Sequence, residues 1–550
     1  MYGVACGYCG RVPIPGCLGR ELMSLCVCMW CGGRFICGSV QQTWACTHAY
    51  PSPTLVYFAY FHGMSTSAIL LVIILSYFAL LLGIAFYTSR GSNNESFFIG
   101  NRSSKWWVVA FGMIGTSLSG MTFISVPGTV GMSGFSYFQV VIGYWLGYFA
   151  VAFILLPIYY KMQLTSIYSY LDERLGTASY KTGALFFILS RTLGATLRLY
   201  LVIKVLELFV LKEMGVSFEF TAVLILVLIL LYTYKGGVKT IVWTDTLQTT
   251  FMILALLVCV IYIMNNLGLS ISGTWEAMTA KGYTKMVNTD IMSAGSFWKS
   301  VLGGAFITIG MTGLDQEMMQ KNISVSNLKD SQKNMITFCF ILLIANFIFL
   351  LLGGLLYLYA DAQGISATGD NIFPFIALKS GLPFFITICF MIGLISALFP
   401  SADGALTALT SSYCIDILGM KRRDDWDEKK KGKIRLIVHN TFAVVFLGCI
   451  FFFREVDNGS LISTLLAVAG YTYGPLLALF AFGIFTKRNV NSKLVPIICI
   501  ASPILCYFLK EHEANLLGNY KIGLELLLIN ATITFTFLYL FSQKTTPKTV

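Results

Sequence analysis

Apolar blocks of about 18–25 residues, separated by short polar joints, recur along most of this chain. As a helix, a block of this length crosses a hydrocarbon core of ~30 Å. Backbone N–H and C=O groups in lipid have no water to bond, so each spanning block must satisfy them internally as an α-helix. The chain is 56% hydrophobic and only 12% charged, too apolar for a soluble protein of 550 residues. We therefore predict an all-α integral membrane protein embedded in a lipid bilayer.

The positions of the blocks and of the charges predict a topology. We expect about 13 spans, at 67–88, 107–130, 135–160, 180–211, 217–235, 240–265, 296–315, 334–360, 380–415, 433–453, 459–486, 493–510 and 521–542. With the N-terminus outside, about 24 of the 38 Lys and Arg residues fall on the inner side and about 8 on the outer side. Such an excess orients a membrane protein, so the net charge of +12 indicates topology and not nucleic-acid binding. We predict a multi-pass protein of the cell (inner) membrane, with its C-terminus inside, that functions as a monomer.

The first 63 residues differ in character from the rest of the chain. Eight of the fifteen Cys residues fall within the first 46 positions. Some are spaced as zinc-binding or disulfide pairs would be, namely Cys6 and Cys9, and Cys26, Cys28 and Cys31, but no clean repeated C-x-x-C pattern follows. Met64 directly precedes a short polar stretch and the first apolar block. We expect residues 1–63 to be a Cys-rich extension that is not native or is disordered, and residues 64–550 to form the membrane domain.

Two sets of five spans within this domain can be laid against each other, at about 107–265 and 296–486. Each set opens with a helix rich in small residues. The first contains the run FGMIGTSLSGMT at 111–122, and the second contains Gly303, Gly304, Gly310 and Gly313. Either helix alone could be a small-residue packing face. As a matched pair of interrupted helices, they favour an inverted-repeat transporter with its binding site near the bilayer midplane.

Several ionisable residues fall inside the predicted spans. Arg191 and Arg198 lie two helical turns apart in the 180–211 span, Asp245 lies near the start of the 240–265 span, and Asp403 lies in the middle of the 380–415 span. Ionisable residues at membrane depth are costly and usually functional. An unpaired charge there would cost several kcal/mol, so Arg198 and Asp403 should each have a partner.

The span that contains Asp403 also carries a stripe of small and hydroxyl residues. Ala397 and Ser401 belong to this stripe, and Pro400 lies between them. We expect Pro400 to interrupt the helix and to free the carbonyl of Ser396, because proline has no N–H to donate. The stripe could serve tight packing, or it could offer oxygens to a hard cation. Proline and aspartate together in one apolar helix favour the cation.

Four motifs in this order resemble the solute:sodium symporter family, which includes sodium/glucose, sodium/proline and sodium/sialic acid carriers. They are FFIGNR at 97–102, GGVKTIVWTDTLQ at 236–248, DQEMMQKN at 315–322 and SSYCID at 411–416. The resemblance covers roughly residues 67–490. It implies a LeuT-like fold of two inverted five-helix repeats, with one extra helix before them and two after.

The resemblance also implies a sodium site. In that family the principal sodium ion is bound between the first and eighth core helices, here the spans at 107–130 and 380–415. The matching positions are Gly115, Leu118, Ala397 and Ser401, whereas Pro400 stands where a hydroxyl ligand is usual.

Some members of the family bind a second sodium ion, at positions that match Asp245, Asp403 and Gly404. We hypothesise that Arg198 lies near Asp245 and Asp403 and takes the charge role of this second ion. One sodium ion would then be moved with each solute molecule.

Solute contacts, by position in the family, fall at Thr122, Phe123, Thr308 and Tyr471, although ordinary packing could explain each of them. The function implied is a sodium-coupled symporter that imports a small organic solute by alternating access. A proton-coupled or sodium-independent permease of the same fold is the alternative, with Asp403 or Asp245 as the proton carrier. An integral membrane enzyme is a distant alternative, because the four His residues lie away from the centres of spans and no nucleophile–base pair is evident.

Overall fold

The computed structural model describes residues 29–31, 34–39, 42–45, 66–89, 97–98, 100–456 and 461–543. The chain divides into two units, Met1–Ser65 and Thr66–Val550. In the first unit, a three-stranded antiparallel sheet is formed by β1 (Met29–Cys31), β2 (Arg34–Ser39) and β3 (Gln42–Ala45). The predicted cysteine pairs of this unit lie outside the side chains that the structure describes. The prediction that residues 1–63 are not native stays a prediction.

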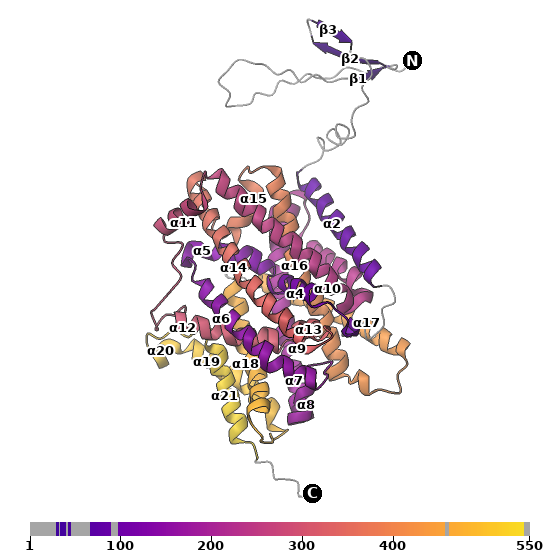
Figure 1. Ribbon diagram of the computed structural model, residues 1–550, viewed down its shortest axis with the longest axis vertical. Helices are drawn as coiled ribbons and strands as arrows, with labels where there is room; N and C mark the ends of the chain where they lie inside the picture. The colour runs from indigo at the N-terminus through magenta and orange to yellow at the C-terminus, as the bar shows by residue number, and fades with distance from the viewer. Residues whose placement is uncertain are drawn as a thin grey trace. The chain divides into compact units, whose positions relative to one another are not determined.

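Every regular element described in the second unit is a helix (Figure 1). The α-helices are α2 (Thr66–Thr88), α4 (Trp106–Ser117), α5 (Gly120–Ser133), α6 (Tyr137–Ala150), α7 (Leu156–Lys161), α8 (Ser169–Leu175), α9 (Thr177–Leu206), α10 (Phe218–Asn266), α11 (Ile271–Ala280), α12 (Phe297–Thr308), α13 (Gln316–Ile323), α14 (Leu328–Gln363), α15 (Ile372–Lys379), α16 (Phe384–Ser412), α17 (Glu428–Glu455), α18 (Leu461–Phe485), α19 (Leu494–Glu511), α20 (Glu513–Leu517) and α21 (Leu526–Leu540). Single π-helical turns extend α6, α9, α12 and α16, at Val151–Leu155, Glu207–Leu211, Ile309–Gly313 and Tyr413–Ile417.

The helices confirm a multi-pass membrane protein. Among the described residues, eight helices are long and apolar enough to cross a membrane, or nine if the bent pair α4 and α5 counts as one span. Two shorter apolar helices, Phe218–Thr233 and Leu526–Leu540, also fall where spans are predicted. The predicted number of about 13 spans stays a prediction.

Two of the predicted interruptions are present in the structure. Helices α4 and α5 are separated at Leu118 and Ser119 and bend by 56°. The chain also leaves the helical path after the π-turn that follows α12 and restarts at Gln316 in α13. Both interruptions belong to the glycine-rich helices that open the two predicted sets of spans.

The long helix α10 is kinked, as the boundary between the predicted spans at 217–235 and 240–265 requires. Gly237 has a φ of 51°, a left-handed value that favours glycine. A Cβ atom at this position would overlap the backbone of Phe97. Glycine is therefore required here by both the backbone conformation and the close approach.

The expectation that Pro400 interrupts its helix is wrong. Helix α16 runs without a break from Phe384 to Ser412, with Pro400 inside it. Proline removes one N–H from the ladder of hydrogen bonds without ending the helix, and the neighbouring helices α4, α9 and α10 hold α16 in place. Figure 1 shows α4 and α16 in the middle of the bundle, with α2 at its edge.

Helices α6 and α12 approach each other through glycines. A Cβ atom at Gly143 would overlap the carbonyl oxygen of Val301, and one at Gly304 would overlap that of Val140. Small residues at such a contact let two helices in a membrane pack with their backbones close together.

We predict that Gly143→Ala lowers the stability of the protein by roughly 1–3 kcal/mol, since overpacking of a close contact costs about that much. The apparent melting temperature of the purified protein in detergent measures the effect. Gly448→Ala in α17 is the control, because a Cβ atom at Gly448 meets nothing within 4 Å. Equal melting temperatures for Gly143→Ala and the unmodified protein would contradict the close packing.

Candidate functional site

The first part of the site is the break between α4 and α5. The N–H of Leu118 bonds the carbonyl of Ile114 at 2.7 Å, and regular pairing resumes at Phe123, whose N–H bonds the carbonyl of Ser119 at 3.1 Å. Carbonyl groups at a helix C-terminus have no partner within the helix. The last turn of α4, which includes Gly115, and the C-cap residue Leu118 therefore present carbonyl oxygens at the break.

This break packs directly against α10 and α16. A Cβ atom at Gly115 would overlap Thr249 Oγ1 and would lie 3.4 Å from Pro400 Cγ. Ser401 is buried, and its hydroxyl donates to the carbonyl of Leu398 at 2.9 Å, so its oxygen can still accept. The structure thus brings the segment with Gly115 beside the segment with Pro400. Sodium coordination by Gly115, Leu118, Ala397 and Ser401 stays a prediction.

Asp245 of α10 forms an ion pair with a lysine that the sequence interpretation had not singled out. Lys321 of α13 is buried, and its Nζ lies 2.7 Å from Asp245 Oδ2 and 3.4 Å from Glu317 Oε1. The same ammonium donates to Thr116 Oγ1, in the last turn of α4. Lys321 therefore joins α13 to both α4 and α10 next to the break.

Asp403 lies at the edge of this group, fully buried in α16. Its Oδ2 accepts a hydrogen bond from the hydroxyl of Tyr232 at 2.7 Å, and its Oδ1 accepts one from the N–H of Gly404. A Cβ atom at Gly404 would overlap Glu317 Oε1, so the carboxylate of Glu317 fits only because residue 404 is glycine.

A second group of charges shares Glu317 with the first. Arg191 of α9 forms an ion pair with Glu317 Oε2, and its other terminal nitrogen lies 3.7 Å from Asp315 Oδ2. Tyr473 of α18 donates its hydroxyl to Asp315 Oδ2 at 3.0 Å. Because Glu317 Oε1 faces Lys321 and Oε2 faces Arg191, one carboxylate connects the two groups.

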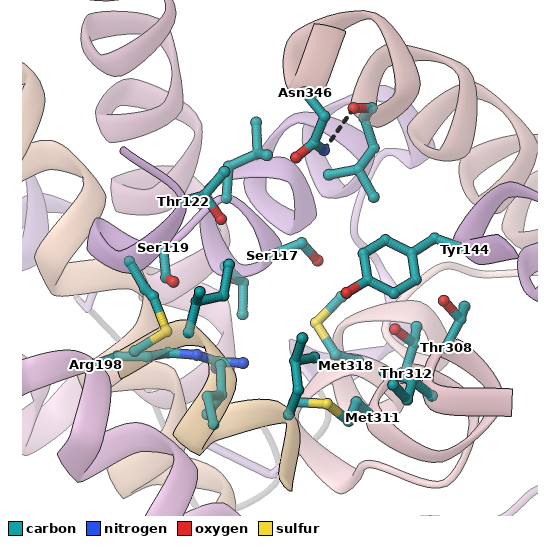
Figure 2. Close-up of a pocket in the computed structure, with 18 of the residues that line it drawn as sticks. Ser117, Ser119, Thr122, Tyr144, Arg198, Thr308, Met311, Thr312, Met318 and Asn346 are labelled. Atoms are coloured by element: carbon teal, nitrogen blue, oxygen red, sulfur yellow. Dashed lines mark hydrogen bonds between the residues drawn. The ribbon is translucent and has the colours of Figure 1, made fainter. Parts of the chain in front are cut away.

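A cavity lies beside these charges (Figure 2). Its walls come from the break between α4 and α5 and from α6, α9, α12 with its π-turn, α13, α14 and α18. The polar side chains that line it include Ser117, Ser119, Thr122, Tyr144, Arg191, Arg198, Thr308, Thr312 and Asn346. Figure 2 shows Arg198 on one side of the cavity and Thr308 and Thr312 on another.

The predicted grouping of Arg198 with Asp245 and Asp403 is wrong. The cation beside Asp245 is Lys321, and Asp403 is held by Tyr232 and Gly404. Arg198 instead lines the cavity, two turns along α9 from Arg191. Spacing along one helix showed that the two arginines share a face, but it could not show which helix this face meets.

The predicted solute contacts divide into two pairs. Thr122 and Thr308 line the cavity, as does the predicted sodium ligand Leu118. Phe123 is fully buried in an aromatic cluster, with ring centroids 5.2 Å from Phe373 and 5.8 Å from Phe390.

Tyr471 points away from the cavity. It packs against Tyr507 of α19, with ring centroids 6.4 Å apart. The residues of α18 that line the cavity are Ile462, Leu465 and Leu466, which lie earlier in the helix than Tyr471. The positions predicted for Phe123 and Tyr471 as solute contacts are therefore corrected, and ordinary packing explains both residues.

Lys321 and Glu317 are the functional candidates that sequence reasoning missed. Both lie in the DQEMMQKN motif, which was used only to establish the resemblance. Their spacing of four residues places them on one helix face, which usually indicates a local surface pair. The available signal was that this charged helix directly follows a glycine-rich span, at membrane depth.

The chain is similar to known membrane transporters. The model of the Sodium:solute symporter family matches residues 97–493. The sodium/sialic acid symporter of Proteus mirabilis is 25% identical over 446 residues, which cover 76% of this chain and 85% of that protein. The sodium-coupled monocarboxylate transporter 2 of Danio rerio is 23% identical over 406 residues, which cover 71% of this chain and 63% of that protein. These relatives are transporters.

One solved structure, a sodium-coupled sialic acid symporter in a substrate-bound outward-open state, superimposes with a TM-score of 0.74. The two chains are 20% identical, and the match covers 87% of this chain and 99% of the other. The predicted fold class, an all-α membrane protein with the architecture of sodium symporters, is confirmed.

We predict that Glu317→Gln destabilises the protein by about 3 kcal/mol, because breaking a buried ion pair leaves charges without compensation. The substitution removes the shared charge between Arg191 and Lys321. The apparent melting temperature should fall. The control is Asp361→Asn, which removes the exposed ion pair with Lys281 and should leave the melting temperature unchanged. An equal effect of the two substitutions would show that the buried network does not stabilise the fold.

Proposed function

The chain belongs to the sodium:solute symporter family, and on that premise we propose that the solute it imports is a small organic anion whose carboxylate is bound by Arg198. The chain is a symporter, and sodium is the ion that drives it. One observation supports the choice of an anion. Arg198 lines the cavity, is only 8% exposed, and forms no ion pair with a carboxylate in the described part of the chain.

The charges around Arg198 leave a place for an anion. The neighbouring Arg191 already takes Asp315 and Glu317 as partners. Arg198 Nε has no hydrogen-bond partner among the described residues. A buried guanidinium without a counterion costs several kcal/mol. A carboxylate that enters the cavity would supply the missing charge and could bind the guanidinium through two parallel hydrogen bonds.

The rest of the cavity would bind the polar body of such a solute. Hydroxyl groups of Ser119, Thr122 and Thr308, and the amide of Asn346, line its walls. Sialic acid and monocarboxylates, named for two of the relatives, both carry a carboxylate at neutral pH.

The segment at the break between α4 and α5 would couple the binding of sodium to the binding of solute. Gly115 and Leu118 would give carbonyl oxygens to sodium, together with Ala397 and Ser401 of α16. Ser119 and Thr122, a few residues later, face the solute cavity. Sodium bound at the break would fix this segment and thus preform one wall of the cavity. By linkage, the solute must raise the affinity for sodium by the same factor.

The transport cycle would proceed by alternating access. Sodium and solute bind from the outside, the bundle closes over them, and the site then opens inward, where low cytoplasmic sodium lets the ion leave. We place the protein in the cell (inner) membrane as a functional monomer, with its N-terminus outside and its C-terminus inside. This orientation puts most of the basic loops on the cytoplasmic side.

We predict that Arg198→Gln abolishes the binding of carboxylates. The measurement is uptake into proteoliposomes of three carboxylates: sialic acid, lactate and pyruvate. Glucose and the methyl ester of sialic acid are the neutral solutes for comparison. Each solute is tested with a sodium gradient and with choline in place of sodium. At least one carboxylate should be taken up only with sodium. Arg198→Gln should reduce its uptake at least 100-fold, since a charge-assisted bidentate pair is lost.

Tyr471→Phe is the matched control, because this side chain faces α19 and should not affect uptake. Sodium-driven uptake of neutral solutes alone would refute the anion proposal. Carboxylate uptake that survives Arg198→Gln would refute the role of Arg198.

We also predict that Ser401→Ala raises the sodium concentration for half-maximal uptake about tenfold, because a ligand hydroxyl is lost at a cost of roughly 1.4 kcal/mol. Thr250→Ala is the control. Thr250 is an exposed residue of α10 whose hydroxyl bonds its own helix, as that of Ser401 does. An unchanged sodium dependence in Ser401→Ala would remove this hydroxyl from the sodium site.

A further inference from the structure

Lys321 forms the centre of a buried group that the proposed solute site does not use. Its ammonium lies 2.7 Å from Asp245 Oδ2 and 3.4 Å from Glu317 Oε1, and it donates to the hydroxyl of Thr116. We propose that this ammonium is a built-in cation that occupies the place of a second sodium ion, so that one sodium ion is moved with each solute. The stoichiometry rests on the proposed sodium-coupled transport, whereas the occupied cation site does not.

The surroundings of the ammonium match what a sodium ion would require. Its neighbours are carboxylate and hydroxyl oxygens, which are the ligands that hard cations prefer. They come from three separate helices, namely Thr116 on α4, Glu317 on α13 and Asp245 on α10. The whole group is screened from solvent, because Lys321 and Glu317 are each 2% exposed and Asp245 is fully buried.

The balance of charge favours a cation at this point. Four buried carboxylates, those of Asp245, Asp315, Glu317 and Asp403, lie in the two connected groups. The cations paired with them are Arg191 and Lys321. Without Lys321, no cation in the described part of these groups would form an ion pair with Asp245. A cation at this point offsets the cost of burying the carboxylate of Asp245.

Oxygen atoms that could receive a sodium ion remain beside the ammonium. Asp245 Oδ1 and Thr249 Oγ1 are buried and have no hydrogen-bond partner among the described residues. Thr249 lies one helical turn after Asp245 on α10, and its hydroxyl faces Gly115. These two oxygens, with Asp245 Oδ2, Thr116 Oγ1 and Glu317 Oε1, would be free to bind sodium if the lysine side chain were removed.

The consequence concerns the charge moved in each cycle. A tethered ammonium stays with the protein, whereas a sodium ion in its place would be carried across. With one sodium ion and one monovalent carboxylate, a complete cycle moves no net charge. A second sodium ion would make the same cycle move one positive charge.

Replacing Lys321 with alanine tests the proposal with sodium alone as the probe. The purified protein is heated in increasing NaCl, with choline chloride holding the ionic strength constant and no solute present. For the unmodified protein, the rise in melting temperature with sodium concentration should fit a Hill coefficient of 1. Lys321→Ala should give a coefficient near 2, and it should make carboxylate uptake into proteoliposomes carry about one positive charge per solute. Lys321→Arg should keep the coefficient at 1.

Two further variants separate the loss of a charge from the opening of a site. In Lys321→Ala with Asp245→Asn, the charge balance is restored and a central ligand is weakened, so the coefficient should return to 1. Lys281→Ala, at an exposed ion pair, should behave as the unmodified protein does. If Lys321→Ala unfolds in choline chloride, NaCl but not KCl should restore the fold.

Several results would overturn the proposal. They are a Hill coefficient of 2 for the unmodified protein, an unchanged sodium response in Lys321→Ala, and a Lys321→Ala protein that stays unfolded in every salt. Because the melting experiment contains no solute, its result does not depend on which solute is carried. Failure of sodium-driven carboxylate uptake in the unmodified protein would instead refute the proposed function.

Discussion

The contact between the break in α4 and the proline-containing part of α16 is the constraint on which the rest of the structure depends. Free backbone carbonyls cannot face lipid, so an interrupted helix must be covered by other helices or line a polar cavity. Here α10 and α16 cover one side of the break, and the cavity lies on the other. The cover is close because Gly115 has no side chain to hold the helices apart. The same break can thus face an ion on one side and a solute on the other.

The buried charges form one connected network and not a set of isolated pairs. Lys321 and Asp245 lie next to the break, Arg191 and Asp315 lie toward the cavity, and Glu317 contacts both cations. Helices α4, α9, α10, α13, α16 and α18 each contribute a side chain to it. Arg198 lines the cavity and lies within electrostatic range of Glu317 and Asp315, but it forms no ion pair with either among the described residues. This difference between two arginines of one helix separates a structural cation from a candidate ligand for the solute.

The sequence alone predicted the class of fold, the two breaks in glycine-rich helices and several residues that line the cavity. Long apolar blocks require helices, and paired glycine-rich spans indicate where those helices are interrupted, as at Leu118 and Ser119. Periodicity along one helix does not reveal its neighbours. For that reason the sequence pointed to Arg198 as the partner of Asp245, whereas the ion-pair partner of Asp245 is Lys321 of α13. Tyr471 and Phe123 were misplaced for the same reason, since a rotation of a helix by one or two residues turns a side chain from the cavity to a neighbouring helix. The sequence does not single out Lys321, because a charged residue shortly after a helix break is typical of a polar loop.

Glu317 gives one oxygen to Lys321 and the other to Arg191. A carboxylate divided in this way responds as a unit, because electron density drawn toward one cation is withdrawn from the other. If Arg191 turns toward an anion bound by the neighbouring Arg198, less of the charge of Glu317 is compensated by Arg191. The attraction between Glu317 and the ammonium of Lys321 then becomes stronger. One shared side chain, Glu317, thus connects the residues that line the cavity to the residues around Lys321.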